Sequence, residues 1–290
     1  MYKIAILGCE NSHADAFIEC IKTNPCYSDV ELLGVYTNEP EAEDRMKEKY
    51  GVYCAKSYDE FVGKLDGVII TARDGANHYK YAKPYIDSGI PMFIDKPITC
   101  DEDEALMLAK ELKSHGCRVT GGSSCVHAPL VVELASYVRE EKLGKVYGGF
   151  LRAPVSLNNA YSGFYFYAQH LVQVTEAIFG FSPVAVTAHQ SGDAVNVLLE
   201  YEKYDVTMQF VDGNYEYYAS LSAEGGVKGD KYPVTADLYP VEFEAFYNLL
   251  CGGEQRVSYE EFIAPVYLIS AIDRSMKSGK REVVLRVGEV

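Results

Sequence analysis

The chain has 290 residues, of which 48% are apolar and 24% are charged, as expected for a globular protein with a substantial core and not for a disordered chain. Its 27 basic and 42 acidic side chains give a formal net charge of −15, which argues against nucleic acid and against an anionic membrane as partners. The length allows one large domain or two domains of ordinary size.

The first 120 residues alternate short apolar runs with helical patterns. Strands are predicted at residues 4–7, 30–36, 52–54, 67–71, 91–95 and 118–120, and helices from residue 12 to just before residue 25 and at 40–50, 58–64, 78–88 and 101–115. Ser12 is the expected N-cap of the first helix, with Asp15 as its capping-box partner. Strands with few polar residues, separated by helices, predict a doubly wound parallel sheet covered on both faces. A ligand would bind at the carboxyl ends of its strands, beside the point where strand order reverses.

The pattern changes after residue 120. A helix at 129–142, a strand at 146–155 and a helix at 167–179 precede four strands at 184–189, 195–201, 206–211 and 215–223, and two helices follow at 241–250 and 259–278. Runs of strands favour an open, mostly antiparallel sheet in an α+β domain. The sequence therefore predicts an α/β protein with a Rossmann-type, doubly wound domain at 1–120 and a separate α+β domain at 121–290.

The start of the chain shows no secretory signal pattern, and no apolar run is long enough to span a bilayer. Eight cysteines are scattered without any CxxC pair, which is typical of a protein of the reducing cytoplasm. We interpret all eight as small buried hydrophobic residues.

The segment 8–13, with the sequence GCENSH, joins the first strand to the first helix, where a dinucleotide fold binds its phosphates. Only the first glycine of GxGxxG is present, at Gly8, while Glu10 and His13 replace the second and third. The helix N-terminus still offers free amides to a pyrophosphate, and Ser12 and His13 can donate hydrogen bonds, but the Glu10 carboxylate weakens binding unless it turns away. The alternative is a helix cap in a fold that has lost its cofactor.

The second strand ends at Thr37 and Asn38, where many dinucleotide folds carry an acidic residue for the ribose hydroxyls. Both side chains can hydrogen-bond a ribose, and no arginine follows at once to hold a 2′-phosphate. NAD is therefore favoured over NADP, although the choice between them stays open.

Three segments carry a resemblance to a known family. Residues 71–78 (TARDGANH) follow the fourth strand, residues 93–97 (FIDKP) end the fifth, and residues 163–170 open a helix in the second half. Together they resemble the glucose-fructose oxidoreductase, inositol dehydrogenase and rhizopine-catabolism (Gfo/Idh/MocA) family over nearly the whole chain. The resemblance implies NAD(P)-dependent oxidation of a sugar, polyol or related hydroxy compound, and a homodimer or homotetramer formed through the second sheet.

Carried over residue by residue, Asp95-Lys96-Pro97 is similar to the family's Glu-Lys-Pro signature, whose lysine lies between nicotinamide and substrate. His170 matches the histidine that takes the substrate's hydroxyl proton, and His78 lies in a loop that covers the cofactor in the family. The residues expected to bind the cofactor are Gly8, Glu10, Asn11, Ser12, His13, Thr37, Asn38, Thr71, Arg73, His78, Asp95 and Lys96.

The chain departs from the family pattern at three places. Phe166 stands where members usually carry an aspartate, four residues before the catalytic histidine; only Ser162-Gly163 remain of the glycine-rich lead-in; and residues 126–129 (VHAP) replace an Arg-aromatic-x-Pro element. Three of the 24 tyrosines, at 161, 165 and 167, fall in the altered segment around Ser162-Gly163 and Phe166. The substrate is therefore the least certain part of the resemblance.

Oxidation of an alcohol by hydride transfer needs a base for the hydroxyl proton and a donor for the developing alkoxide. His170 suits the base and Lys96 the donor, and His127, Tyr165 and Tyr167 are expected to join them in binding substrate. Each also has an ordinary structural interpretation: a packed helical histidine, a solvated lysine at a strand end, a surface histidine, or tyrosines packed between domains. A metal site from Glu10, His13 and Asp15 lacks standard ligand spacing, and we expect none.

Two alternatives to a dehydrogenase stay open. The first is a non-catalytic nucleotide or ligand sensor, suggested by the broken pattern at Glu10, His13 and Phe166. The second is a lyase or isomerase that cycles a tightly held cofactor through a transient ketone. The sequence does not distinguish this reaction from that of a dehydrogenase.

Overall fold

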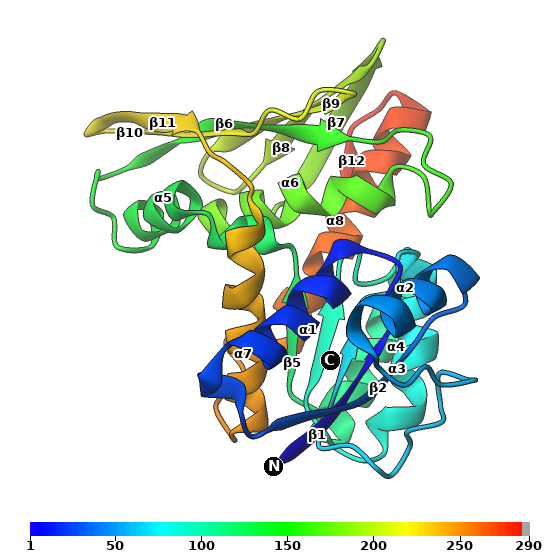
Figure 1. Ribbon diagram of the computed structural model, residues 1–290. Coiled ribbons are helices and arrows are strands. Elements are labelled where there is room, and N and C mark those ends of the chain that lie inside the picture. Colours follow the sequence, from blue (N-terminus) through cyan, green and yellow to red (C-terminus); the bar gives the residue numbers. More distant parts are fainter. Residues whose placement is uncertain (286–290) are drawn as a thin grey trace. The chain divides into compact units, whose positions relative to one another are not determined.

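Five parallel strands form the first sheet of the computed structural model, which describes residues 1–285 (Figure 1). The order is β2-β1-β3-β4-β5, with bounds β1 (Tyr2–Leu7), β2 (Val30–Tyr36), β3 (Gly67–Ile70), β4 (Met92–Asp95) and β5 (Val119–Gly122). The chain leaves β1 toward β2 on one side, and β3 lies on its other side. Strand order therefore reverses between β1 and β3, and the predicted doubly wound parallel sheet is confirmed.

Helices cover both faces of this sheet. α1 (Ser12–Thr23) and α7 (Tyr239–Leu250) lie together on one face, and α3 (His78–Ile86) and α4 (Glu102–Ser114) lie on the other, with α2 (Pro40–Tyr50) following β2 (Figure 1). The core on the α1 side is aromatic: the Phe17 ring centroid lies 5.0 Å from that of Phe93 and 5.6 Å from that of Phe243. Short 3-10 turns stand at Pro25–Tyr27 and Gly75–Asn77.

Two predicted elements of this half are wrong. Residues 52–54 make only one isolated bridge, between Val35 and Cys54, and residues 58–64 form turns instead of a helix. A seven-residue helix gains too few hydrogen bonds to offset its nucleation cost, and Gly63, with φ 75°, lies outside the helical region.

The second sheet has seven strands in the order β11-β10-β6-β9-β8-β7-β12. Their bounds are β6 (Val146–Val155), β7 (Ala185–Ser191), β8 (Ala194–Glu200), β9 (Asp205–Asp212), β10 (Tyr218–Ala223), β11 (Gly226–Lys231) and β12 (Glu282–Val283). All neighbours are antiparallel except β6 and β9, which confirms the mostly antiparallel sheet. α5 (Pro129–Arg139), α6 (Tyr165–Phe179) and α8 (Tyr259–Ser278) lie on one face, and no described helix covers the other (Figure 1).

The described chain divides into two units, and the division differs from the predicted boundary at residue 120. The first unit comprises Met1–Gly122 and Ala236–Phe262, and the second comprises Ser123–Thr235 and residues from Ile263 to 285. α7 therefore belongs to the first unit although it follows the second sheet in sequence. The reason is its apolar face: Phe243, Phe246 and Leu250 are part of the same buried cluster as Ile4 and Phe17.

Replacing Phe243 by alanine is expected to lower the free energy of unfolding by about 3–5 kcal/mol, because the fully buried ring would leave a cavity among Phe17, Tyr27 and Phe246. Urea denaturation measures this loss. The matched control is Val241→Ala, two residues away on the same helix and 38% exposed, for which a change within about 0.5 kcal/mol is expected. Equal effects of the two substitutions would contradict the assignment of α7 to this core.

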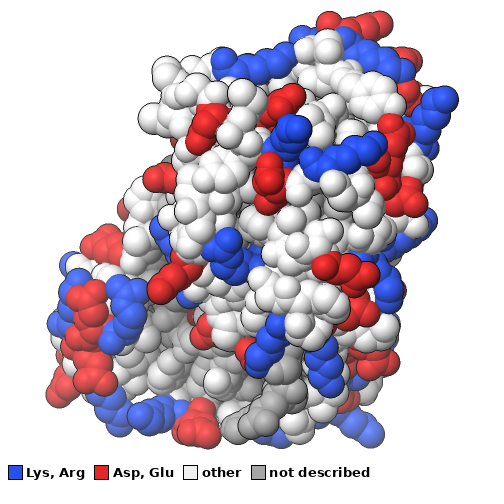
Figure 2. Space-filling model, turned by 90° about the horizontal axis from the view of Figure 1, so that it is seen from below, with Lys and Arg blue, Asp and Glu red and all other residues white. Residues whose placement is uncertain are grey.

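The structure shows how the charged side chains are distributed, and it corrects the interpretation of the cysteines. Lysine, arginine, aspartate and glutamate side chains are interspersed over the face shown in Figure 2, and within residues 1–285 no helix is both long and apolar enough to cross a membrane. All eight cysteines have free thiols. Their interpretation as buried hydrophobic residues is wrong for Cys26 and Cys251, which are exposed, and holds fully only for Cys9, Cys117 and Cys125.

Candidate active site

The loop between β1 and α1 has the backbone of a phosphate-binding turn. Gly8 adopts φ 86°, and a Cβ atom there would lie 2.2 Å from the Cα of Ala72, so the position admits only glycine. α1 begins at Ser12, but its N-cap is Asn11, whose Oδ1 accepts from the His13 amide at 3.1 Å. The predicted capping box is thus wrong by one residue. Asp15 instead accepts from the Tyr50 hydroxyl at 2.9 Å.

Glu10 turns into the protein and joins the ends of two strands. Its Oε1 accepts from the Thr37 hydroxyl, after β2, at 2.5 Å, and its Oε2 accepts from the Arg73 amide, after β3, at 3.1 Å. Arg73 in turn donates to the Glu10 carbonyl at 2.6 Å, and Arg45 of α2 donates to the Cys9 carbonyl at 2.5 Å. The two guanidinium groups also pair with acidic side chains outside the loop: Arg73 lies 3.3 Å from Glu39 and Arg45 lies 3.2 Å from Asp15.

The loop after β3 is hydrogen-bonded to the loop between β1 and α1. The Thr71 hydroxyl donates to the Gly8 carbonyl at 2.5 Å, and the Asn11 amide group donates to the Thr71 carbonyl at 3.0 Å. Asn38 is exposed at the end of β2. His78 is fully buried, with Nε2 2.9 Å from the Ala72 carbonyl, and burial lowers its pKa. His78 therefore braces the turn as a neutral side chain, and its predicted contact with a cofactor stays a prediction.

The end of β4 carries the residues of the predicted signature. Asp95 is fully buried, and its Oδ1 accepts from the Lys96 amide at 2.7 Å. Its Oδ2 lies 3.1 Å from His13 Nδ1 and accepts from the Asn11 amide group at 3.3 Å. Lys96 is half-buried and precedes Pro97 through a cis peptide bond.

Two residues that the sequence analysis missed contact the loop between β1 and α1 or the start of α1: Arg45, through the Cys9 carbonyl, and Glu242, through His13. Glu242 of α7 is 2% exposed, and its Oε2 lies 3.4 Å from His13 Nε2. A signal for it was present: Tyr239, Glu242, Phe243 and Phe246 follow the i, i+3, i+4, i+7 pattern of a buried stripe, so a carboxylate interrupts the apolar face of this helix.

In the second unit, His170 of α6 is buried and hydrogen-bonded. Its Nδ1 lies 2.7 Å from the Ser123 hydroxyl and 3.4 Å from Cys125 Sγ, and the Ser123 hydroxyl also accepts from the Cys125 amide at 3.2 Å. Neither residue was predicted, although both lie just before the altered residues 126–129. His127 itself is half-buried at the end of the 3-10 turn Ser124–His127.

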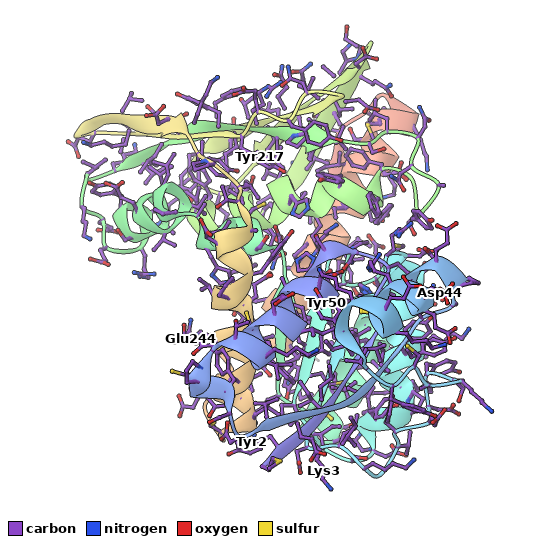
Figure 3. The ribbon with its side chains drawn as sticks, viewed as in Figure 1. Tyr2, Lys3, Asp44, Tyr50, Tyr217 and Glu244 are labelled. Carbon is purple, nitrogen blue, oxygen red and sulfur yellow. The ribbon has the colours of Figure 1, made fainter. Side chains whose placement is uncertain are left out.

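A row of aromatic rings ends at His170. The Tyr167 ring centroid lies 5.0 Å from that of His170 and 6.3 Å from that of Tyr215. Phe166, at the position of the missing aspartate, packs between Tyr161 and Tyr167 at 6.0 and 5.7 Å, and Tyr165 is half-buried. Tyr217 lies between the sheet and the helices of this unit (Figure 3). Tyr161 and Tyr167 thus belong to a continuous series of packed aromatic rings that reaches His170.

The residues of the first unit fit a dinucleotide, which the structure does not contain. The positive-φ glycine and the N-terminus of α1 suit an anionic pyrophosphate, and Thr37 and Asn38 stand where a ribose is held. Across residues 1–285, no group of three or more histidine, cysteine, aspartate or glutamate side chains is placed to hold a metal ion.

The fold, together with the turn at Gly8 before α1, defines a dinucleotide-binding α/β protein with a second, sheet-containing unit. Residues 2–123 match the Gfo/Idh/MocA family, described as an oxidoreductase family with an NAD-binding Rossmann fold. The predicted resemblance is confirmed over residues 2–123, which match this NAD-binding oxidoreductase family. No curated protein matches the chain.

Solved structures resemble the chain over both units. A myo-inositol dehydrogenase from Corynebacterium glutamicum has a TM-score of 0.83 at 16% identity, with 98% of this chain and 99% of that chain covered. A scyllo-inositol dehydrogenase from Lactobacillus casei, with bound NAD(H) and scyllo-inositol, has a TM-score of 0.82 at 14% identity, with 98% and 99% covered. A myo-inositol 2-dehydrogenase from Lactobacillus plantarum has a TM-score of 0.84 at 15% identity and the same coverage. At these identities the likeness establishes the fold.

Proposed function

We propose that the protein is an NAD-dependent dehydrogenase that transfers hydride between the nicotinamide and a CH–OH group of a sugar, polyol or related hydroxy compound. The observation that carries this proposal is Lys96 at the carboxyl end of β4, inside the segment that matches an NAD-binding oxidoreductase family. Inositols are the first substrates to test, because proteins of the same fold are inositol dehydrogenases.

In this proposal the cofactor supplies the hydride acceptor when bound, and the chain supplies binding and proton chemistry. Gly8 and the first turn of α1 hold the phosphates, and Thr37 and Asn38 hold the ribose, while the Glu10 carboxylate stays turned into the protein. The Lys96 ammonium donates a hydrogen bond to the developing alkoxide. His170 takes the hydroxyl proton at Nε2, while its Nδ1 faces Ser123. His127, Tyr165 and Tyr167 bind the remaining hydroxyls.

Calorimetric titration with NAD⁺ and NADP⁺ tests the cofactor. We expect NAD⁺ to bind more tightly, because the buried Glu10 carboxylate beside Thr37 repels a 2′-phosphate. Absorbance at 340 nm with myo-inositol, scyllo-inositol and other polyols then tests turnover. A protein that binds neither nucleotide would overturn the proposal.

Phe166 favours one second candidate, a non-catalytic sensor that binds nucleotide without turnover. A lyase or isomerase would keep its nicotinamide and show turnover without net reduction.

We also propose a cytoplasmic homodimer or homotetramer that associates through the uncovered face of the second sheet. The eight free thiols accord with a reducing compartment. On β8 the side chain of Leu198 is 43% exposed, between the inward-facing Val197 and Leu199. We expect light scattering to show a dimer or tetramer, and Leu198→Glu to shift it toward monomer by burying a charge in the interface. A monomeric wild-type protein would contradict this interface.

A further inference from the structure

His13 lies between two buried carboxyl groups of the first unit. Its Nδ1 is 3.1 Å from Asp95 Oδ2 and its Nε2 is 3.4 Å from Glu242 Oε2, and the three residues are 4%, 0% and 2% exposed. They come from α1, β4 and α7, so three distant segments of sequence meet at this imidazole. The Tyr239 ring covers it, with ring centroids 4.4 Å apart.

Stability alone does not account for this cluster. Apart from the 3.4 Å ion pair with His13, neither carboxyl oxygen of Glu242 has a hydrogen-bond partner among residues 1–285, and a buried carboxyl group with so little compensation destabilises a fold. An apolar side chain at position 242 would continue the buried stripe of α7 and is often neutral or stabilising in place of a buried ion pair. A buried charged group that does not stabilise the fold is a candidate for a functional role.

The charges of the cluster extend to Lys96. Burial by itself lowers the pKa of His13, but the carboxylates of Asp95 and Glu242 outweigh it, so the pKa of His13 is raised. Burial raises the pKa of Glu242 to about 7, against the opposing effect of His13. The Lys96 ammonium lowers the pKa values of both His13 and Glu242, so it lies within electrostatic reach of both. Asp95, Glu242 and Lys96 are therefore the charged groups that face the imidazole.

We propose that Glu242 is a positioning residue for Lys96 and acts on it through His13 and Asp95. The inference rests on the proposed dehydrogenase function, in which Lys96 touches the substrate. Glu242 holds His13 as the imidazolium, and the imidazolium holds Asp95 Oδ2. The other oxygen of Asp95 accepts from the Lys96 amide at 2.7 Å, which fixes the backbone from which the lysine side chain extends. His13, which stands at the third glycine position of GxGxxG, thus connects α1 to the end of β4 through its ion pair with Asp95.

NMR on the full-length protein tests this chain of contacts without any need for activity. Glu242→Gln keeps the shape of the side chain and removes its charge. We expect the His13 imidazole to titrate about one pH unit lower in this variant than in the wild type, and the Lys96 Cε resonance to shift at pH 7. An unchanged His13 titration, or an unchanged Lys96 resonance beside a shifted His13 titration, would overturn the proposal.

Two controls separate the effect from a general loss of a carboxylate. Glu244 is exposed on the same helix and points away from it (Figure 3), and Glu176 of α6 is 1% exposed, with both carboxyl oxygens lacking a hydrogen-bond partner within the described chain. Neither Glu244→Gln nor Glu176→Gln should move the resonances of His13 or Lys96. If Glu242→Gln does not fold, His13→Gln breaks the same link from the other side and should shift the Lys96 resonance.

In the active enzyme, Glu242→Gln should lower kcat about tenfold while the KM for NAD⁺ stays within about twofold. A loss of NAD⁺ binding with kcat unchanged would contradict the positioning role. A wild-type protein without turnover would instead refute the proposed function, and the NMR result would still decide whether Glu242 acts on Lys96.

Discussion

Lys96→Met is expected to lower kcat/KM for the hydroxy substrate by about 10²–10³-fold, because methionine keeps the bulk of the stem but offers no donor to the developing alkoxide. Lys96 follows β4, and its amide is fixed by Asp95 Oδ1 at 2.7 Å, so the substitution removes the ammonium without removing this backbone contact. The Kd for NAD⁺ should stay within about threefold, since the phosphate loop lies at the ends of β1 and β3. Absorbance at 340 nm and calorimetry measure the two effects.

Lys80→Met is the matched control for this substitution. Lys80 is an exposed lysine of α3 whose ammonium lies 5.4 Å from the Tyr58 ring centroid, away from the β4 end. Full activity of Lys80→Met beside an inactive Lys96→Met assigns the loss to the ammonium of Lys96. Turnover by Lys96→Met within a factor of three of the wild type would remove Lys96 from the reaction and favour the sensor.

The first sheet was predictable because its determinants are local. Apolar runs such as residues 67–71 separate amphipathic helices, and β1, β2, β3, β4 and β5 follow those runs to within a few residues. β11 was missed for a physical reason: all of its residues are exposed at the edge of the second sheet, so it shows no apolar alternation. Backbone pairing with β10 alone defines it.

The candidate site was predictable in part. Gly8, Lys96 and His170 stand in local contexts that a sequence reveals. Gly8 lies in a turn before a helix, Lys96 follows the end of a strand, and His170 lies in the second turn of a helix. Glu242 and Ser123 act only through partners far away in sequence, at separations of 229 and 47 residues from His13 and His170. Local patterns carry no information on such pairings, and the assignment of α7 to the first unit depends on packing that only the folded chain shows.

His170→Asn is expected to lower kcat/KM by about 10²–10⁴-fold, because asparagine retains polar contacts near Ser123 but does not take a proton from the substrate. The role of a base at Nε2 requires the proton of the neutral ring to be on Nδ1, and the hydrogen bond at Nδ1 selects that tautomer. The Ser123 hydroxyl, 2.7 Å away, is the group placed to accept it. In the proposed mechanism, a serine from the start of the second unit therefore orients the histidine.

Ser123→Ala separates this orienting role from packing. The neutral ring would then lose its acceptor at Nδ1, and we expect kcat to fall on the order of 10-fold to 10²-fold, with Ser123→Thr restoring most of it because the hydroxyl returns. ¹⁵N NMR of the His170 ring should show the Nδ1–H tautomer in the wild type and in the threonine variant, but not in Ser123→Ala. Cys125→Ala removes the other neighbour of Nδ1, at 3.4 Å, and should leave the tautomer unchanged. If the cysteine variant loses the tautomer and the alanine variant at position 123 retains it, the thiol orients the base and the assignment to Ser123 is wrong.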